Sequence, residues 1–186
     1  MGKKFLVVAS AVGLALAFAH GSALATHTKD EAGCVNTMNK DLGKMMKFKG
    51  KDFTKCVKDA SKSKVPDAQV CFDSDPKGKI AKQVLKTIAD EGKKCGMGGG
   101  PSGYTSGATV NSAGEGAIED LVSDVFGGSM SGLISILKVE GGCQAAVTKR
   151  LQKIVDAKMK EFGKCKKDLL KAAGDAIETC VTPGAC

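Results

Sequence analysis

Cysteine is the residue type in this 186-residue chain whose number and spacing could do chemistry. Thiols form structural disulfides, bind metal ions or carry out thiol–disulfide exchange. Zinc sites usually take their ligands in close pairs, whereas the closest cysteines here, Cys180 and Cys186, are six positions apart. The chain also lacks a C-x-x-C redox motif. The eight cysteines therefore favour structural disulfides over a metal-thiolate or thiol-redox site, and we expect no metal and no cofactor.

Six of the cysteines form two triplets with the same internal spacing. Within each triplet the separations are 22 and 15 positions, and the second triplet is displaced from the first by 109. The motif K-x-F-x-K-C-x-K-D-x-x-K surrounds the middle cysteine of both, at 51–62 and at 160–171. Agreement at this many positions indicates an internal duplication of one structural unit. The triplets are Cys34, Cys56 and Cys71, and Cys143, Cys165 and Cys180.

Other residues that could catalyse a reaction are scarce. After export only His27 would remain as a histidine, so a Ser-His or Cys-His arrangement is hard to build. Asp59 and Asp168 occupy equivalent positions beside a cysteine in the two copies. Each follows a lysine by four residues, and this spacing favours a helical ion pair over a catalytic carboxylate dyad. We therefore expect a protein that is not an enzyme.

The N-terminus predicts export. Lys3 and Lys4 precede an uncharged apolar run, and small residues follow up to Ala25. This order is typical of a cleaved secretory signal peptide, and the run is short for a membrane span. An uncleaved membrane anchor is the alternative. We expect cleavage near Ala25 and a secreted or periplasmic protein, in which cysteines form disulfides.

The charge of the chain is almost entirely lysine and is divided along the sequence. Two basic regions flank a middle segment, 95–137, that contains acidic residues and no basic one. Arg150 is the only arginine, and the chain has one tyrosine and no tryptophan, so we expect no nucleic-acid binding. We interpret the lysines as lying on solvent-exposed faces of helices. The alternative hypothesis is that they attract the chain to an anionic polymer or envelope surface.

Apolar residues at steps of three and four predict a long helix from about Cys34 to Val57, and a second copy of it from about Val147 to Leu169. Polar residues and Pro66 end the first helix. Asp75 and Pro76 are suited to cap and begin the next helix. The apolar face of this next helix is predicted to consist of Ile80, Ala81, Val84, Leu85, Ile88 and Cys95.

The helix geometry restricts the disulfide pairing. Cys34 and Cys56 lie about 33 Å apart on one helix and cannot bond to each other. If the next helix folds back antiparallel, nested bridges Cys56–Cys71 and Cys34–Cys95 close both ends of a hairpin. Cys165–Cys180 can close a similar turn in the second unit. The pairing of Cys143 and Cys186 stays open: with each other, with the other unit, or with a second chain in a homo-oligomer.

The middle of the chain has two parts. Residues 96–116 are rich in Gly, Ser and Thr and predict a flexible loop. Residues 117–142 carry an interrupted apolar pattern that predicts short helices. These helices either pack into the core or form a membrane or partner contact through residues such as Ile134 and Leu137.

The motif K-x-F-x-K-C-x-K-D, the run D-P-K-G-K-I-A-K at 75–82 and the signal sequence together resemble a group of exported lysine- and cysteine-rich helical proteins of bacteria, for which no activity is assigned. The expected fold is all-α, a bundle of disulfide-stapled helical hairpins built from two related units. The segments are a signal peptide (1–25), a first unit (26–95), a loop (96–116), short apolar helices (117–142) and a truncated second unit (143–186).

The expected function is that of a structural or binding protein of the envelope or extracellular space. A membrane-active or toxin-like protein that uses residues 117–137 is the alternative, and a metal-thiolate or redox protein is the third hypothesis.

Overall fold

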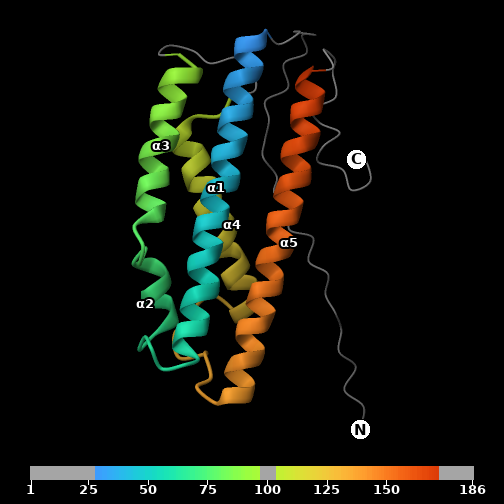
Figure 1. Ribbon diagram of the computed structural model, residues 1–186. Helices are drawn as coiled ribbons and strands as arrows, with labels where there is room; N and C mark the ends of the chain where they lie inside the picture. The colour runs from blue at the N-terminus through green and yellow to red at the C-terminus, as the bar shows by residue number, and fades with distance from the viewer. Residues whose placement is uncertain (1–27, 97–103, 172–186) are drawn as a thin grey trace.

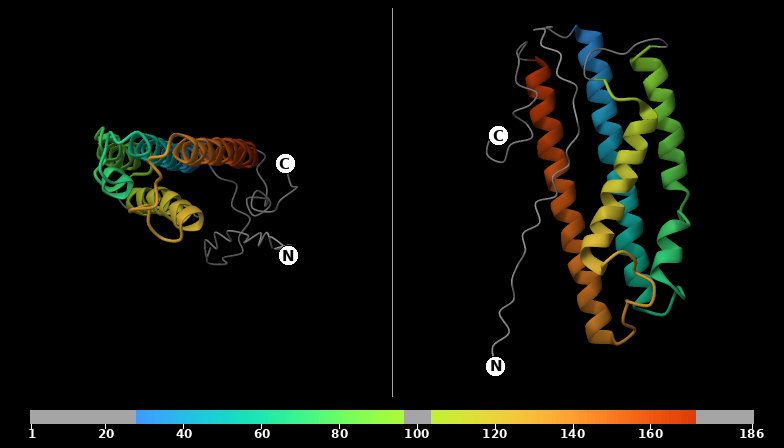
Figure 2. Two further views of the ribbon diagram at one scale, coloured as in Figure 1. Left: turned by 90° about the horizontal axis from the view of Figure 1, so that it is seen from below. Right: turned by 180° about the vertical axis from the view of Figure 1, so that it is seen from behind.

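The computed structural model describes residues 28–96 and 104–171, and these residues form five helices and no strand. The all-α fold class predicted from the sequence is confirmed. Three long segments, α3, α1 and α5, lie side by side in one layer, and α4 packs behind that layer (Figures 1 and 2). α1 occupies the centre of the layer and contacts each of the other helices. It is therefore the element on which the bundle is assembled.

The central helix α1 spans Lys29–Ala60. Its first turn is fixed by a capping box, in which Glu31 N–H donates to the Thr28 hydroxyl and the Thr28 N–H donates to the Glu31 carboxylate. It ends at Ala60, and its C-cap Ser61 is the first residue of the polar run from which the sequence predicts the end of the helix. Among the described helices none covers the fourth side of α1, because α3, α4 and α5 lie over the other three.

The chain returns along α1 through α2 (Ala68–Asp73) and α3 (Lys79–Lys94). The short helix α2 was not predicted; Asp67 caps it by accepting a hydrogen bond from the Val70 N–H. The predicted first position of α3, Pro76, is wrong by three residues, because a turn intervenes and Gly78 enters the helix with a left-handed φ of 60°. Asp75 still caps α3, since its carboxylate accepts hydrogen bonds from Lys79 N–H and Ala81 N–H.

Helix α4 spans Gly107–Phe126, so the prediction of a loop over 96–116 is wrong for its second half. Ser106 caps this helix by accepting a hydrogen bond from Thr109 N–H. The small residues that suggested a loop allow a close approach instead. A Cβ atom on Gly114 would lie 2.8 Å from Cβ of Met45 on α1.

The prediction of separate short helices over 117–142 is also wrong. Residues 117–126 complete α4, a turn region follows from Gly127, and residues from Lys138 onward begin α5 (Lys138–Lys171). Gly127 ends α4 in the left-handed conformation, as glycine at a helix C-terminus often does. The apolar pattern of 117–137 is thus divided between a helix that packs on α1 and an irregular connection.

The core lies where α1, α2 and α4 meet. Phe53 is fully buried, and its ring makes edge-to-face contacts with Phe72 and Phe126 at centroid distances of 6.2 Å. The core also includes the Cys56–Cys71 bridge. The remaining buried members are Val57, Ala60, Ala68, Ile118, Val122 and Met130.

Candidate functional site

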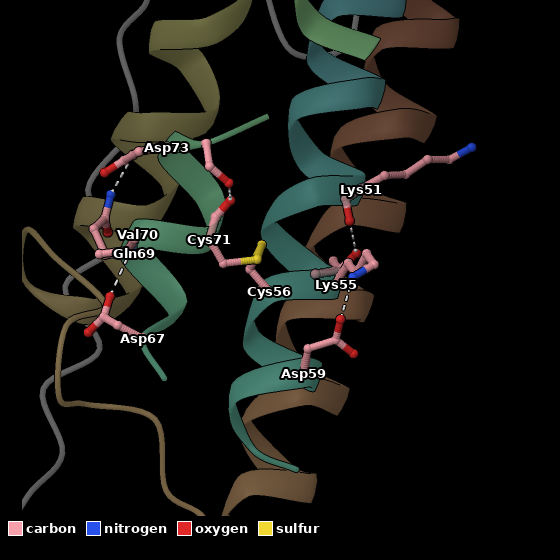
Figure 3. The surroundings of a disulfide bond; sticks show 11 residues. Lys51, Lys55, Cys56, Asp59, Asp67, Gln69, Val70, Cys71 and Asp73 are labelled. Carbon is pink, nitrogen blue, oxygen red and sulfur yellow. Dashed lines mark hydrogen bonds and ion pairs between the residues drawn. A yellow bond between two sulfur atoms is a disulfide. The ribbon is translucent and has the colours of Figure 1, made fainter. Parts of the chain in front are cut away.

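Two disulfides close both ends of the α1–α3 hairpin, as the helix geometry predicts. Cys34 bonds to Cys95 with a Cα–Cα distance of 4.9 Å, and Cys56 bonds to Cys71 with a Cα–Cα distance of 5.6 Å (Figure 3). These pairs are structural, because Cys34 and Cys56 are buried.

Of the four cysteines of the second unit, the structure describes two. Cys165 is disulfide-bonded, whereas Cys143 is an exposed free thiol. The predicted partners Cys180 and Cys186 lie outside the described residues. Within residues 28–96 and 104–171, no group of three or more His, Cys, Asp or Glu side chains could hold a metal ion.

The paired carboxylates considered for chemistry serve local structure. Asp59 forms an ion pair with Lys55 one turn earlier on α1, which confirms the predicted interaction in the first copy (Figure 3). The hydrogen bond from Lys55 lowers the pKa of Asp59 below its ordinary value. Asp168, the equivalent residue of the second copy, is exposed on α5.

A second group of charged residues is buried on α1. Lys49 is only 6% exposed, lies over the ring of Phe72 at 4.1 Å, and bridges to Glu119 of α4 at 3.2 Å. Asp52, one turn further, is also buried, and one of its carboxylate oxygens has no hydrogen-bond partner. Desolvation raises the pKa of Asp52 above its ordinary value, and nearby Asp75 acts in the same direction.

We expect Asp52→Asn to raise the free energy of unfolding at neutral pH by roughly 1 kcal/mol, because a neutral amide is less costly to bury than an unpaired carboxylate. A raised pKa in the folded state means that the stability of the wild type falls as the pH rises above 3.8. The gain should therefore shrink as the pH falls, and it should level off below 3.8, where Asp52 becomes protonated in both states. Urea denaturation at several pH values measures it. Asp59→Asn is the control and should be destabilising at neutral pH.

Lysines occupy the side of α1 that none of the other four described helices covers. Gly50 faces Gln152 of α5, Met45 faces Gly114 of α4, and Cys34 is bonded beside α3. At 100° per residue, a row of lysines at steps of three and four falls on the remaining side. Five of them are exposed. Lys40, Lys47, Lys51 and Lys58 span about 27 Å of α1, and Lys62 follows just after the end of the helix.

An equivalent row follows α5. α5 runs antiparallel beside α1 (Figures 1 and 2), and its Gln152 side chain contacts Gly50. Its lysine row is turned by about 90° from Gln152. Because the two helices are antiparallel, this rotation places the row on the same side of the layer as the row of α1, opposite α4. Its exposed members are Lys149, Lys153, Lys160, Lys164 and Lys167.

The two rows together form one surface, here called the lysine face, defined by the ten residues just given. Helix axes in contact are about 8–10 Å apart, so the rows lie close enough to act on one partner. The opposite side of the layer carries α4, whose charged residues are all acidic: Glu115, Glu119, Asp120 and Asp124. The two sides of the layer therefore differ in charge at α1 and α5, with the lysine face on one side and the acidic helix α4 on the other.

The predicted contact residues of the middle segment differ in exposure. Leu137 is 61% exposed, whereas Ile134 is half-buried against the core. The apolar face predicted for α3 is wrong in part, because Gln83 and Thr87 are buried there while Leu85 is 72% exposed. In the described residues, no helix is long and apolar enough to cross a membrane.

Comparison of the chain with protein-family models, with curated proteins and with solved structures finds no match.

Proposed function

We propose that this chain is an exported, non-enzymatic binding protein that attaches to an anionic envelope surface through its lysine face. The observation that supports the proposal is the alignment of the two lysine rows on one side of the layer. A lysine near an anionic membrane surface contributes about 1 kcal/mol of attraction, which falls off within a Debye length. Several lysines in one plane act within that length together, whereas lysines scattered over all sides do not.

The disulfides suit such a role. The Cys56–Cys71 bridge holds one end of α1 against α2, and the Cys34–Cys95 bridge holds the other end against the C-terminus of α3, so the helix that carries the first lysine row is fixed in the bundle at both ends. The acidic helix α4 lies on the far side and would face away from the anionic surface. The protein would therefore bind with a defined side towards its partner.

The test is cosedimentation of the purified protein with vesicles that contain anionic phospholipid, against vesicles of zwitterionic lipid alone. We expect replacement of Lys40, Lys47, Lys51 and Lys58 by Gln to weaken binding at least about tenfold. The matched control replaces four exposed lysines outside α1 and α5, which are Lys64, Lys77, Lys93 and Lys94. Equal losses in the two variants would reject the lysine face and leave only a net-charge effect.

The membrane-active alternative is favoured by one observation, the exposed apolar residues Leu133, Ile136, Leu137 and Val139 at one end of the bundle. The remainder of its segment supports it less, since Ile118 and Val122 are buried in the core. Release of vesicle contents by the protein, abolished by charging Leu137, would favour this alternative over attachment. A thiol titration that finds several free cysteines in the native protein would favour the metal-thiolate or redox hypothesis.

A further inference from the structure

The duplicated helices carry the same stripe of seven positions in different environments. On α1 the stripe starts at Cys34, ends at Cys56, and proceeds in steps of 4, 3, 4, 4, 3 and 4 residues. Eleven residues make three turns in this pattern, so the stripe runs straight along the helix. All seven residues are at most 6% exposed: Cys34, Met38, Asp41, Met45, Lys49, Asp52 and Cys56.

The middle of the same stripe on α5 is open in the described part of the chain. Val147 is 46% exposed and Ile154 is 53% exposed, where their counterparts Met38 and Met45 are buried. Among the described helices, α5 packs against α1 alone, so none covers this stripe. The seven residues are Cys143, Val147, Arg150, Ile154, Lys158, Glu161 and Cys165.

The open stripe lies at the outer edge of the layer. Gln152 faces α1, and Ile154 follows it by two residues, which is a rotation of about 200° around the helix. Ile154 therefore points almost directly away from α1. The layer α3–α1–α5 ends at this edge, in a face that contains both an apolar centre and charges.

We infer that a second copy of this chain docks on this edge, with its α5 antiparallel to the first. The charges of the stripe carry the inference because they complement themselves. Arg150 and Glu161 are both exposed, and neither has an ion-pair partner among the described residues. About a twofold axis between Val155 and Asp156, each Arg150 faces Glu161 of the second copy, and each Ile154 faces its Ala157.

The first unit does not share this property. The positions equivalent to Arg150 and Glu161 on α1 are Asp41 and Asp52, which are both acidic and would repel in such a pairing. Arg150 is also the only arginine of the chain. Arginine presents a planar fork that matches a carboxylate, which lysine does not. Arg150, the basic residue that makes the stripe self-complementary, is thus the one basic residue of the chain that is not a lysine.

The dimer extends the layer to α3–α1–α5–α5–α1–α3. A twofold axis perpendicular to the layer keeps the lysine faces of both copies on the same side, and the doubled face would strengthen attachment to an anionic surface. This consequence rests on the proposed function, whereas the dimer does not. Dimerisation is measured without vesicles, so it can fail while vesicle binding persists, and the reverse also holds.

The test is the mass of the full chain in solution as a function of concentration, by sedimentation equilibrium. Arg150→Glu and Glu161→Arg should each raise the dimer dissociation constant about tenfold or more, because each reversal converts two attractive contacts into repulsive ones. The double variant R150E/E161R should restore wild-type dimerisation. Lys160→Glu is the control with the same charge change on the lysine face and should leave the constant unchanged. A wild type that stays monomeric, or a double variant that is not restored, overturns the proposal.

The register has its own readout. In a Cys143→Ser background, Ile154→Cys should form a covalent dimer under mild oxidation, since the two substituted positions are offset by about 4.5 Å along the helix axes. The two Cys143 positions would be about 37 Å apart along the axes and should not cross-link in the wild type. A Cys143-linked dimer overturns this pairing. A second result would also overturn it: a monomeric protein in which truncation after Lys171 increases the labelling of the thiol at position 154. In that case residues 172–186, and not a second copy, would cover the stripe on α5.

Discussion

Replacing Phe53 by Ala should lower the free energy of unfolding by about 4 kcal/mol. Phe53 is fully buried and its ring lies between Phe72 of α2 and Phe126 of α4, so the substitution leaves a cavity where three helices meet. It also removes two edge-to-face aromatic contacts, which add to the loss of buried area. Denaturation with urea under non-reducing conditions measures the change.

The duplication provides the matched control for this substitution. Phe162 occupies the equivalent position of α5, is only half-buried, and lies near Lys166, whose ammonium is 4.8 Å from the ring centroid. We expect Phe162→Ala to cost about 1–2 kcal/mol, because the ring already contacts solvent and little cavity is formed. Similar losses at the two positions would contradict the conclusion that the core lies where α1, α2 and α4 meet rather than along α5.

Removing the Cys34–Cys95 bridge, by replacing both cysteines with Ala, should lower the free energy of unfolding by about 4 kcal/mol. The bridge closes a loop with a sequence separation of 61 residues, and in the chain-entropy account a longer loop restricts the unfolded chain more. Removing Cys56–Cys71 should cost about 3 kcal/mol, since its separation is 15 residues.

The order of the two losses is the informative result. Both double variants are compared by urea denaturation with the wild type, and peptide mapping of the unreduced proteins shows that the remaining pairs are unchanged. A larger loss for the short-loop bridge would mean that packing around Cys56, which is 0% exposed, outweighs the effect on the unfolded chain.

The hairpin could be predicted from the sequence because its determinants are local. The 22-residue spacing of Cys34 and Cys56 fixes their distance on a helix, and the polar run before Pro66 ends that helix. Antiparallel return then leaves one arrangement of the two bridges. The Lys55–Asp59 ion pair is predictable for the same reason, since both residues lie on one helix at a spacing of four.

The helical second half of the loop predicted over 96–116 and the buried face of α3 could not be predicted, because they depend on tertiary contacts that cannot be inferred from residue composition. Gly114 resembles a loop residue in the sequence, yet it is required in α4 by the proximity of Met45. Gln83 and Thr87 are polar, but Gln83 Nε2 donates to the Thr87 hydroxyl, and this pair can be buried against α1 while Leu85 stays exposed. The sequence indicates that the lysines lie on solvent-exposed faces of the helices. It does not indicate that the lysines of α1 and α5 share one side of the layer, because this depends on the antiparallel packing of the two helices.

The nesting of the two bridges has a consequence for how the protein matures. Closing the short loop between Cys56 and Cys71 costs less chain entropy than closing the long one between Cys34 and Cys95. We therefore expect oxidation to start at the turn. Once Cys56–Cys71 has formed, it shortens the loop that remains to be closed between Cys34 and Cys95. The two disulfides should therefore form in sequence, first at the turn and then at the other end of α1. The correct pairs are thereby selected by the order of bond formation.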